Sequence, residues 1–404
     1  MGKRIENDTA MNKIKTLCIV HCALCIAICA YAQDWATILP AIERNNKSLQ
    51  ALRQEVEAEK AANHVGIAPA NPEVEFSYLW GHGAEEGSRM DLSVSQSLPL
   101  STLLGYQSRL AEQQDLRADL RLRVERTAVL LQAQQTCIDI VYTNAMLHEY
   151  GKRLAHAQTL ADAYRQKFEA GNANALEYNK VRLNLATAQG EYQRLLTERN
   201  TLLEQLASLN GGEAIVLNDS VFEGVFPPAD FDSWYAEAET RSPMLAYVRQ
   251  EVAVAKADAR LSKAEWLPDL SIGYMSEGMT GNYYNGVTVG VSVPLWQNSH
   301  RVRQAKASAE AAQLRADEQK QLFLSTLRTQ YAAVMGLQKT WQGYHEALLL
   351  TNSADLLLQA LQAGQISMLE YMMELSIYYD ATAQALSAQR DYYTALAELQ
   401  AVAL

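Results

Sequence analysis

The chain has 404 residues and a formal net charge of -11, an acidic balance that argues against a nucleic-acid partner. Its length is enough for two or more globular domains or for one elongated protomer. After the first 32 residues there is no run of about 18 apolar residues, so no transmembrane helix is expected and strands would have to carry any membrane role.

Residues 1–32 have the features of a signal peptide, whose start is either Met1 or Met11. A basic N-terminal segment with lysines precedes an apolar run at 17–28, and an Ala-x-Ala cleavage site occupies 30–32. The apolar run of about a dozen residues is too short to serve as a membrane anchor. We therefore expect the mature protein to be exported.

The distribution of cysteines fits this expectation. Four of the five cysteines lie within the signal peptide, so Cys137 is alone in the mature chain and no intramolecular disulfide is expected. Lipid attachment at Cys29 would require a small residue before it, and Ile28 is not small. Simple cleavage is the favoured interpretation.

The first repeat, residues 33–210, starts with helical periodicity at 35–66 and continues into a hairpin. Strands are expected at 72–80 and 89–99, around a glycine-rich turn. Apolar and polar residues alternate along both strands, which gives the hairpin one apolar and one polar face. The apolar positions are Val74, Phe76, Tyr78, Leu92 and Val94, with Trp80 at one strand end and Pro72 and Pro99 at the corners.

A long tract without proline, residues 101–171, then predicts a helix of about 100 Å, which is more than one globular domain covers. After a turn the chain is expected to return as a shorter helix at 174–210. The turn carries Gly171, Leu176, Glu177 and Tyr178.

Residues 211–235 contain paired glycines and paired prolines and are interpreted as a linker with one short strand at 214–217. A second repeat follows at 236–404. Residues 53–56 and 249–252 are four consecutive identities at an offset of 196, which indicates internal duplication.

The second repeat presents the same elements in the same order. They are a helix at 236–264, strands at 267–275 and 286–294, a long helix at 296–364 and a return helix at 367–403. The apolar strand positions are Leu270, Ile272, Tyr274, Val287, Val289, Val291 and Val293, with Pro268 and Pro294 at the corners and Trp266 and Trp296 at strand ends. The second turn carries Gly364, Leu369, Glu370 and Tyr371.

Two interpretations of the hairpins remain open at this point. Strands of roughly 9 to 11 residues suit a tilted membrane strand, and aromatic residues at both rims suit the two interfaces of a bilayer. The alternation is equally compatible with amphipathic hairpins on a soluble core. In the membrane case four strands cannot close a barrel, so several chains must contribute.

No catalytic set emerges from the sequence. The seven histidines are scattered, and His148 and His156 lie too far apart on one helix to share a metal without help. Motifs for phosphate binding or for a nucleophilic serine are missing, and Cys137 is interpreted as a small packed residue. We expect no enzyme activity, no cofactor and no metal site.

Glu177 and Glu370 occupy equivalent positions in the two turns and allow two interpretations. Around a symmetric oligomer they would form a ring of carboxylates, which favours cations at a narrow opening. Alternatively, each glutamate begins its return helix and stabilises the N-terminal dipole.

Taken in order and in duplicate, these motifs resemble the TolC-like outer membrane efflux proteins. The shared pattern is a helix, a proline-led hairpin, Ser-x-Pro-Leu, a long helix, a Gly-x-x-x-x-Leu-Glu-Tyr turn and a return helix. The resemblance implies a mainly α protomer with a membrane β-barrel contribution. Three protomers would form a homotrimer with a 12-stranded barrel and a long α-helical barrel.

The same resemblance implies a passive export duct in the outer membrane of a Gram-negative cell, with a helical extension in the periplasm. A periplasmic adaptor and an inner membrane pump would be its partners, and outer membrane lipid would surround its strands. The two turns and their named residues would dock the adaptor. The first turn is similar to the heavy-metal and cation efflux branch, although the pump normally determines the cargo. A periplasmic coiled-coil scaffold and an exported enzyme are the alternatives, in that order.

Overall fold

The computed structural model describes residues 35–82, 87–222, 224–279, 282–296, 298, 300–349 and 353–403. The expected signal peptide at 1–32, including Cys29, lies outside the described residues, as does part of the first hairpin turn. Within the described part, no helix has both the length and the apolar content needed to cross a bilayer.

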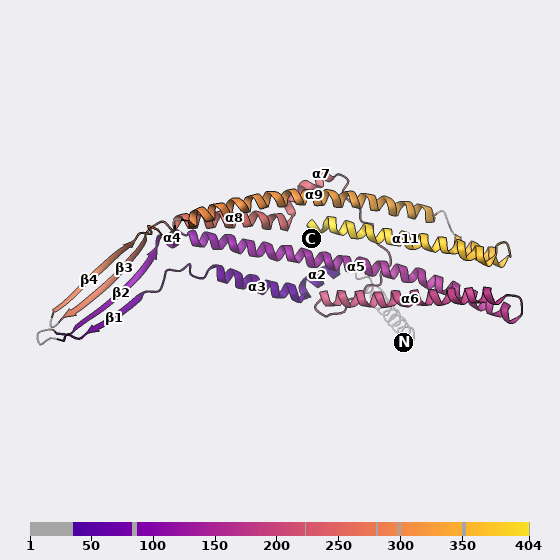
Figure 1. Cartoon of the computed structure of the whole chain (residues 1–404), viewed down its shortest axis with the longest axis horizontal. Helices are drawn as coiled ribbons and strands as arrows, with labels where there is room; N and C mark the ends of the chain where they lie inside the picture. Colours follow the sequence, from indigo (N-terminus) through magenta and orange to yellow (C-terminus); the bar gives the residue numbers. More distant parts are fainter. Residues whose placement is uncertain are drawn as a thin grey trace, which may run out of the picture. The chain divides into compact units, whose positions relative to one another are not determined.

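The chain forms two compact units. The turn unit comprises the described residues within 35–47, 129–227 and 330–401, and the sheet unit comprises those within 48–128, 228–329 and 402–403. Two long helices, α5 (Tyr106–Glu169) and α9 (Arg301–Leu349), each contribute residues to both units (Figure 1).

The remaining helices divide between the units. Those of the sheet unit are α3 (Lys47–Asn63), α4 (Leu100–Leu103), α7 (Phe231–Arg241) and α8 (Pro243–Ala264). Those of the turn unit are α2 (Trp35–Asn45), α6 (Ala175–Leu209), α10 (Ser353–Gln362) and α11 (Met368–Gln400), and a short 3-10 helix, η1 (Ala401–Ala403), ends the described chain. The expected mainly helical fold with a small sheet is therefore confirmed.

Three of the expected helices are interrupted within the described residues, and a fourth, expected at 296–364, begins only at Arg301. The helix expected at 236–264 breaks at Ser242, which caps α8. The helix expected at 35–66 breaks at Asn46, whose side chain donates a hydrogen bond to the Leu209 carbonyl at 2.8 Å. The tract at 101–171, expected to be continuous, breaks at Gly105, which has a φ of 73°. Since a left-handed backbone ends an α-helix and suits glycine, α4 stops there and α5 begins at the next residue.

The segment at 211–235 also differs from expectation. Its described residues contain no strand, and 214–217 is irregular. Helix α7 begins inside the expected linker, at Phe231. Leu217 is nevertheless buried, and its carbonyl accepts a hydrogen bond from the Asn144 side chain at 3.2 Å. The segment is thus attached to the helices by side-chain contacts without a strand ladder.

The described residues of the sheet unit form a four-stranded antiparallel sheet in the order β1-β2-β3-β4. The strands are β1 (Glu73–Leu79), β2 (Arg89–Pro99), β3 (Asp269–Met279) and β4 (Asn282–Ser292). The two hairpins therefore lie side by side, with β2 paired to β3, and β1 and β4 form the edges (Figure 1).

The second hairpin is longer than the sequence pattern predicted. The strands expected at 267–275 and 286–294 are shifted toward the hairpin end, and the expected loop between them is mostly paired strand. Gly278 faces Tyr283 in this pairing, and a Cβ on the glycine would lie 3.0 Å from the tyrosine ring. The glycine thus makes room for the ring, and it does not mark a turn.

The core of the turn unit lies among α5, α6 and α11. Its buried members are Leu160, Ala161, Tyr164, Val181, Met368, Tyr371 and Leu375. Burying each large side chain of this kind contributes about 1.5 to 3 kcal/mol, so this cluster fixes the two return helices against α5.

Candidate functional site

The strand register gathers the predicted apolar residues on one face of the sheet. Cross-strand neighbours share a face, and the face alternates along each strand. One row across the sheet consists of Val74, Val94, Tyr274 and Val287. The pairs that extend this face are Phe76 with Leu92, Tyr78 with Met90, Ile272 with Val289, and Leu270 with Val291. Val293 lies just beyond β4 and continues its alternation.

This apolar face is exposed in the protomer. Val287 is 73% exposed, Val289 75% and Phe76 61%. A soluble monomer rarely leaves so many large apolar side chains in one contiguous patch, so the face requires an apolar environment outside the protomer. This property separates the sheet from an amphipathic hairpin that covers a soluble core.

The opposite face of the sheet is polar and acidic. Its charged residues are Glu73, Glu75, Asp91, Asp269 and Glu277, with Arg89 as the one cation among the described residues of this face. The Arg89 guanidinium lies 3.0 Å from the Asp91 carboxylate and 3.2 Å from that of Glu277. One hydrated, carboxylate-rich face and one apolar face are the two sides that a wall between water and lipid needs.

The three tryptophans predicted at strand ends lie at both ends of the sheet. Trp80 follows β1 at the hairpin end, whereas Trp266 and Trp296 lie at the end where the helices start. Their exposed fractions are 73%, 41% and 81%, in that order. Strands β2, β3 and β4 between these rims have 11 residues each, which suits a tilted strand that crosses a bilayer.

The corner prolines lie where the sheet meets helices and loops. Pro99 ends β2 and caps α4 with a φ of -62°. Pro72 immediately precedes β1, and Pro268 immediately precedes β3. Pro294 comes two residues after the end of β4. Because proline lacks an N–H and fixes φ, each of these residues limits how far the ladder extends.

The two turns of the turn unit share one backbone design. Gly171 and Gly364 have φ values of 77° and 70°, which suit glycine at the end of a helix. Asn174 accepts a hydrogen bond from the Glu177 N–H at 2.9 Å, and the Glu177 carboxylate accepts one from the Asn174 N–H at 3.1 Å. Each return helix therefore begins with a capping box, because the second turn repeats this exchange.

In the second turn the capping partners are Ser367 and Glu370. The Glu370 carboxylate accepts a hydrogen bond from the Ser367 N–H at 2.7 Å, and the Ser367 hydroxyl accepts one from the Glu370 N–H at 3.2 Å. Hydrogen bonds from Ser367 hold the pKa of Glu370 below its usual value. Of the two interpretations of these glutamates, the structure supports the helix-start role.

The other predicted turn residues separate into exposed and buried positions. Leu176 and Leu369 are 66% and 57% exposed. Tyr178 is partly exposed and stacks on Phe168, with 5.2 Å between the ring centroids. Tyr371 is only 1% exposed and lies in the core cluster, so it cannot contact a partner and acts as a packing residue.

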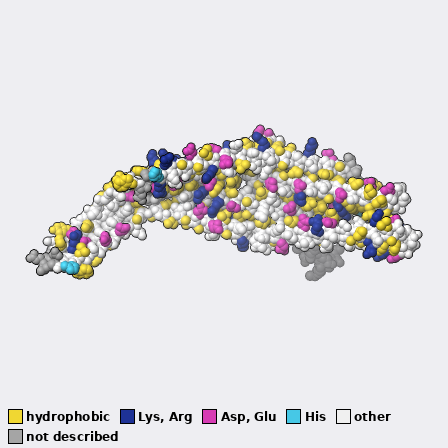
Figure 2. Space-filling model, in the orientation of Figure 1, with side chains coloured by type: hydrophobic (Ala, Val, Ile, Leu, Met, Phe, Trp, Pro, Cys, Tyr) yellow, Lys and Arg dark blue, Asp and Glu magenta, His cyan; other side chains and the backbone are white. Residues whose placement is uncertain are grey.

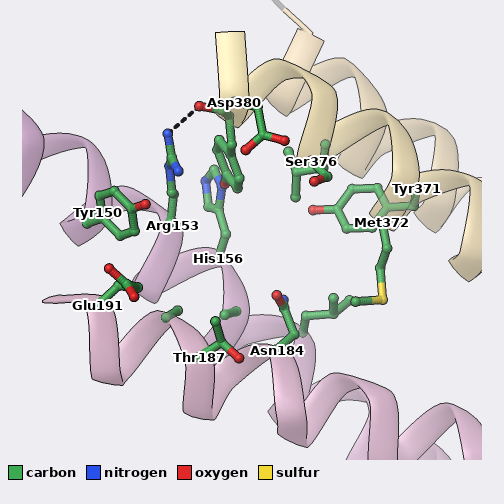
Figure 3. A pocket seen from close by; sticks show the side chains of 15 residues that line it. Tyr150, Arg153, His156, Asn184, Thr187, Glu191, Tyr371, Met372, Ser376 and Asp380 are labelled. Atoms are coloured by element: carbon green, nitrogen blue, oxygen red, sulfur yellow. Dashed lines mark hydrogen bonds between the residues drawn. The ribbon is translucent and has the colours of Figure 1, made fainter. Parts of the chain in front are cut away.

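One polar cluster was missed by the sequence reasoning. Arg153 on α5 lies between the rings of Tyr150 and Tyr379, with 4.3 Å to each centroid, and donates a hydrogen bond to the Tyr379 carbonyl at 2.6 Å. A ring nitrogen of His156 lies 2.9 Å from the Tyr379 hydroxyl. The residues line a cavity of about 210 Å³ between α5, α6 and α11 (Figure 3). The cluster connects α5 to α11 by polar contacts.

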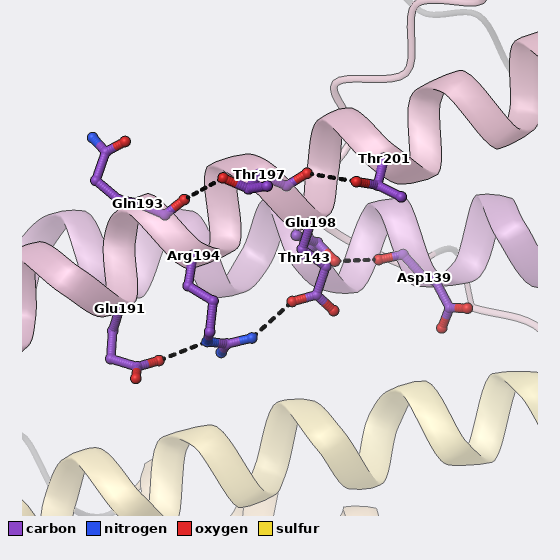
Figure 4. A network of polar contacts seen from close by, with 8 residues as sticks. All are labelled: Asp139, Thr143, Glu191, Gln193, Arg194, Thr197, Glu198 and Thr201. Carbon is purple, nitrogen blue, oxygen red and sulfur yellow. Dashed lines mark hydrogen bonds and ion pairs between the residues drawn. The ribbon is translucent and has the colours of Figure 1, made fainter.

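A second polar network lies along α6. Arg194 makes ion pairs of 2.9 Å with both Glu191 and Glu198, and threonine hydroxyls donate to carbonyls one turn earlier (Figure 4). These groups are largely exposed, so each pair stabilises the helix by only about 0.3 to 0.5 kcal/mol. The network supports the helix and offers no reactive site.

The ligand groups of a metal centre are not assembled in the described part of the chain. No group of three or more His, Cys, Asp or Glu side chains is placed there to hold a metal ion. Cys137 is 1% exposed, and burial raises the pKa of its thiol to about 12. Such a thiol stays protonated and unreactive near neutral pH.

A family model described as outer membrane efflux protein matches residues 38–212 and 234–403. The chain belongs to this family. The family expected from the sequence motifs is thereby confirmed, and with it the assignment to the outer membrane and to export. The outer membrane efflux proteins are channels, and the exposed apolar face of the sheet fits that class.

Two curated relatives are named for export of different cargo. AprF of Pseudomonas aeruginosa, an alkaline protease secretion protein, is 26% identical over 403 residues, which cover 88% of this chain and 81% of that protein. OpmQ of Pseudomonas putida, a pyoverdine export outer membrane protein, is 25% identical over 313 residues, which cover 70% of this chain and 66% of that protein.

Solved structures of outer membrane proteins share the fold. CusC superimposes with a TM-score of 0.76 at 14% identity, over 91% of both chains. VceC of Vibrio cholerae superimposes with a TM-score of 0.72 at 12% identity, over 91% of this chain and 96% of that one. At these identities the likeness shows that the backbone arrangement is common to the family members.

Proposed function

We propose that this protein is the passive outer membrane duct of a tripartite export system. In this proposal the strands cross the outer membrane, and the polar face of the sheet lines a water-filled passage. The helices extend that passage into the periplasm, where an adaptor and an inner membrane pump deliver the cargo. The single observation that carries the proposal is the strand register, which separates an exposed apolar face from a carboxylate-rich one.

The sheet edges support a homotrimer. In the described part of the protomer, strands β1 and β4 each have a neighbour on one side only. Their outer backbone groups would lack hydrogen bonds in lipid, at a cost of several kcal/mol per group. Pairing β1 of one copy with β4 of the next removes both edges. Three copies would supply 12 strands, which exceeds the eight of the smallest known barrels.

The two turns are the proposed docking surface for the adaptor. Leu176 and Leu369 are the exposed apolar side chains there, beside Tyr178. The capped helix starts, with Glu177 and Glu370, hold the turns in one conformation. Gly171 and Gly364 permit the sharp reversal that exposes them. Tyr371 is buried in the core next to the second turn, so it is not part of the proposed docking surface.

For the cargo we propose a chemical class and no single compound. The polar face carries more carboxylates than cations, so we propose a passage that favours cationic or neutral solutes, including those of a heavy-metal or multidrug pump. AprF and OpmQ are named for a protease and a siderophore, so family membership alone does not determine the cargo.

The test is a pair of matched double variants in β4. Val289→Arg with Val291→Arg places two charges on the apolar face, where each costs about 2 to 4 kcal/mol at the bilayer midplane. Thr288→Arg with Ser292→Arg adds the same charges to the polar face. We expect the first variant to reduce heat-resistant oligomers in the outer membrane at least about tenfold and the second to assemble normally. Equal assembly of both variants would refute the proposal.

A further inference from the structure

A group of basic side chains lies where the second hairpin joins its helices. Its members are Arg260 and Lys263 on α8, and Arg301, Arg303 and Lys306 on α9, and all of them are exposed. Figure 2 shows Lys and Arg side chains gathered over the start of α9 near the sheet. We call these five residues the basic surface.

The contacts between α8 and α9 bring the five residues together. Lys256 donates a hydrogen bond to Gln313 at 2.9 Å at one end of the paired segment. Arg301 forms an ion pair of 2.9 Å with Glu265 at the other end. The α8 residues between these two contacts therefore lie alongside the same stretch of α9, so the five basic residues gather at the end of the helix pair nearest to the sheet. Arg303 and Lys306 are three residues apart and share one face of α9.

Most of the charge on this surface is uncompensated. Arg301 is paired with Glu265, whereas Arg303 and Lys306 have no ion pair in the described part of the chain. The next carboxylates along the two helices, Asp258 and Glu310, lie farther from the sheet than the basic residues do. The end of each helix that is nearest to the sheet is therefore the more positive one.

The basic surface follows directly after an aromatic rim. Trp296, which is 81% exposed, precedes Arg301 by five residues, and strand β4 ends four residues before the tryptophan. From Arg301 to Lys306 the helix rises about 8 Å, which is close to one Debye length at physiological ionic strength. A membrane surface at the level of Arg301 would thus lie within electrostatic reach of all three α9 cations.

The first hairpin shows that the junction does not need these charges. The corresponding start of its helices carries exposed Leu103 and Leu104, which are 52% and 54% exposed. The first basic residue of α5, Arg109, lies over the Tyr106 ring at 5.9 Å. The same corner is therefore built without a basic surface, so the charges at the second corner serve something other than the fold.

We propose that the basic surface binds the headgroups of anionic phospholipids in the periplasmic leaflet of the outer membrane. The proposal rests on the function proposed above, because that function places the end of β4 at the membrane surface. The charges are complementary: exposed Lys and Arg attract phosphate, and the exposed tryptophan ring suits the headgroup level. The lipid would fix the depth and tilt of the second hairpin at this interface.

The test measures lipid selectivity of the purified full-length oligomer in detergent. Phosphatidylglycerol and phosphatidylcholine are added separately, and bound lipid is counted by native mass spectrometry. The test variant is Arg303→Gln with Lys306→Gln. The control, Arg315→Gln with Lys339→Gln, removes the same charge from exposed positions farther along α9.

We expect the native protein and the control to prefer phosphatidylglycerol by about tenfold, and the test variant to lose most of this preference. Rising salt should weaken the preference of the native protein. No preference in the native protein, or equal loss in both variants, would overturn the inference. Dissociation of the test oligomer alone would assign the surface to a contact with a second copy and would also overturn it.

Bilayer conductance separates this inference from the proposed function. All three proteins should form channels, since none of the substituted residues lies on the strands. If all three proteins form channels and the native protein has no lipid selectivity, the lipid inference is refuted and the proposed function as an export duct still holds. Lipid selectivity without conductance in any of the three proteins would refute the duct.

Discussion

The two turns of the turn unit have the same backbone and different side-chain roles. Both have a left-handed glycine followed by a capping box, and both carry Leu-Glu-Tyr at the helix start. The tyrosine differs in its surroundings: Tyr178 stacks on Phe168 at the surface, whereas Tyr371 is buried in the core. Local sequence thus determines how each turn closes, and the packing around it determines which residues remain available to a partner.

The largest expected effect comes from removing the two tyrosines one at a time. Tyr371→Ala leaves a cavity in the core among α5, α6 and α11 and should destabilise the turn unit by about 3 to 5 kcal/mol. Tyr178→Ala removes one partly exposed stacked pair and should cost about 1 kcal/mol. Hydrogen exchange of the turn-unit amides measures both. Similar losses of stability for the two variants would show that the two tyrosines contribute equally to the packing of their turns.

The next comparison concerns charge selectivity. The structure uses the turn glutamates as caps and leaves carboxylates on the polar face of the sheet. Glu73→Gln with Glu75→Gln should therefore lower the cation preference of the channel about twofold to fivefold. Glu177→Gln with Glu370→Gln should change it less, and conductance in salt gradients measures both. A larger effect at the turns would restore the carboxylate-ring interpretation.

The two caps should make equal contributions. Asn174→Ala and Ser367→Ala each remove the acceptor for the N–H of the third helical residue, at a cost of about 1 kcal/mol. Local hydrogen exchange in the first turns of α6 and α11 reports the change. Unequal effects would mean that the two capping boxes contribute different free energies although their hydrogen bonds have the same pattern.

The smallest expected effect is a dependence on pH at the second turn. The folded pKa of Glu370 is below its usual value because hydrogen bonds from Ser367 favour the carboxylate. A lowered folded pKa contributes stability above the unfolded value of about 4.3, and that stability is lost as the pH falls through the folded value. The first turn of α11 should therefore fray in acid. The measurement is the amide protection factor, in which the intrinsic pH dependence of exchange is removed. Protection factors that do not fall in acid, or that fall equally in Glu370→Gln, would contradict this assignment.

Much of the functional surface was predictable because strand alternation is a local property. Val74, Tyr274 and Val289 could be assigned to one face from the sequence, and the register now places them there. The role of Glu177 at the start of its helix could likewise be predicted from the sequence, because a capping box depends on two residues that are three positions apart.

The remaining features depend on contacts between distant residues. The burial of Tyr371 follows from α5 and α6, and the Arg153–Tyr379 contact joins residues that are 226 positions apart. Gly278 lies between the strands expected at 267–275 and 286–294, where a loop was implied, whereas its pairing with Tyr283 shows that it accommodates a ring within a strand. Gly105 looked compatible with a continuous helix until its positive φ marked a break. Sequence patterns of short range contain no information on these contacts.

The most direct test asks which face of β4 meets lipid. A fluorophore on Val289→Cys or on Thr288→Cys, in the oligomer reconstituted into vesicles, would be exposed to brominated lipid and to aqueous iodide in turn. Cys137 is buried and should not react. We predict that brominated lipid quenches the label at 289 and that iodide quenches the label at 288. Quenching of both labels by iodide, with none by lipid, would contradict the account.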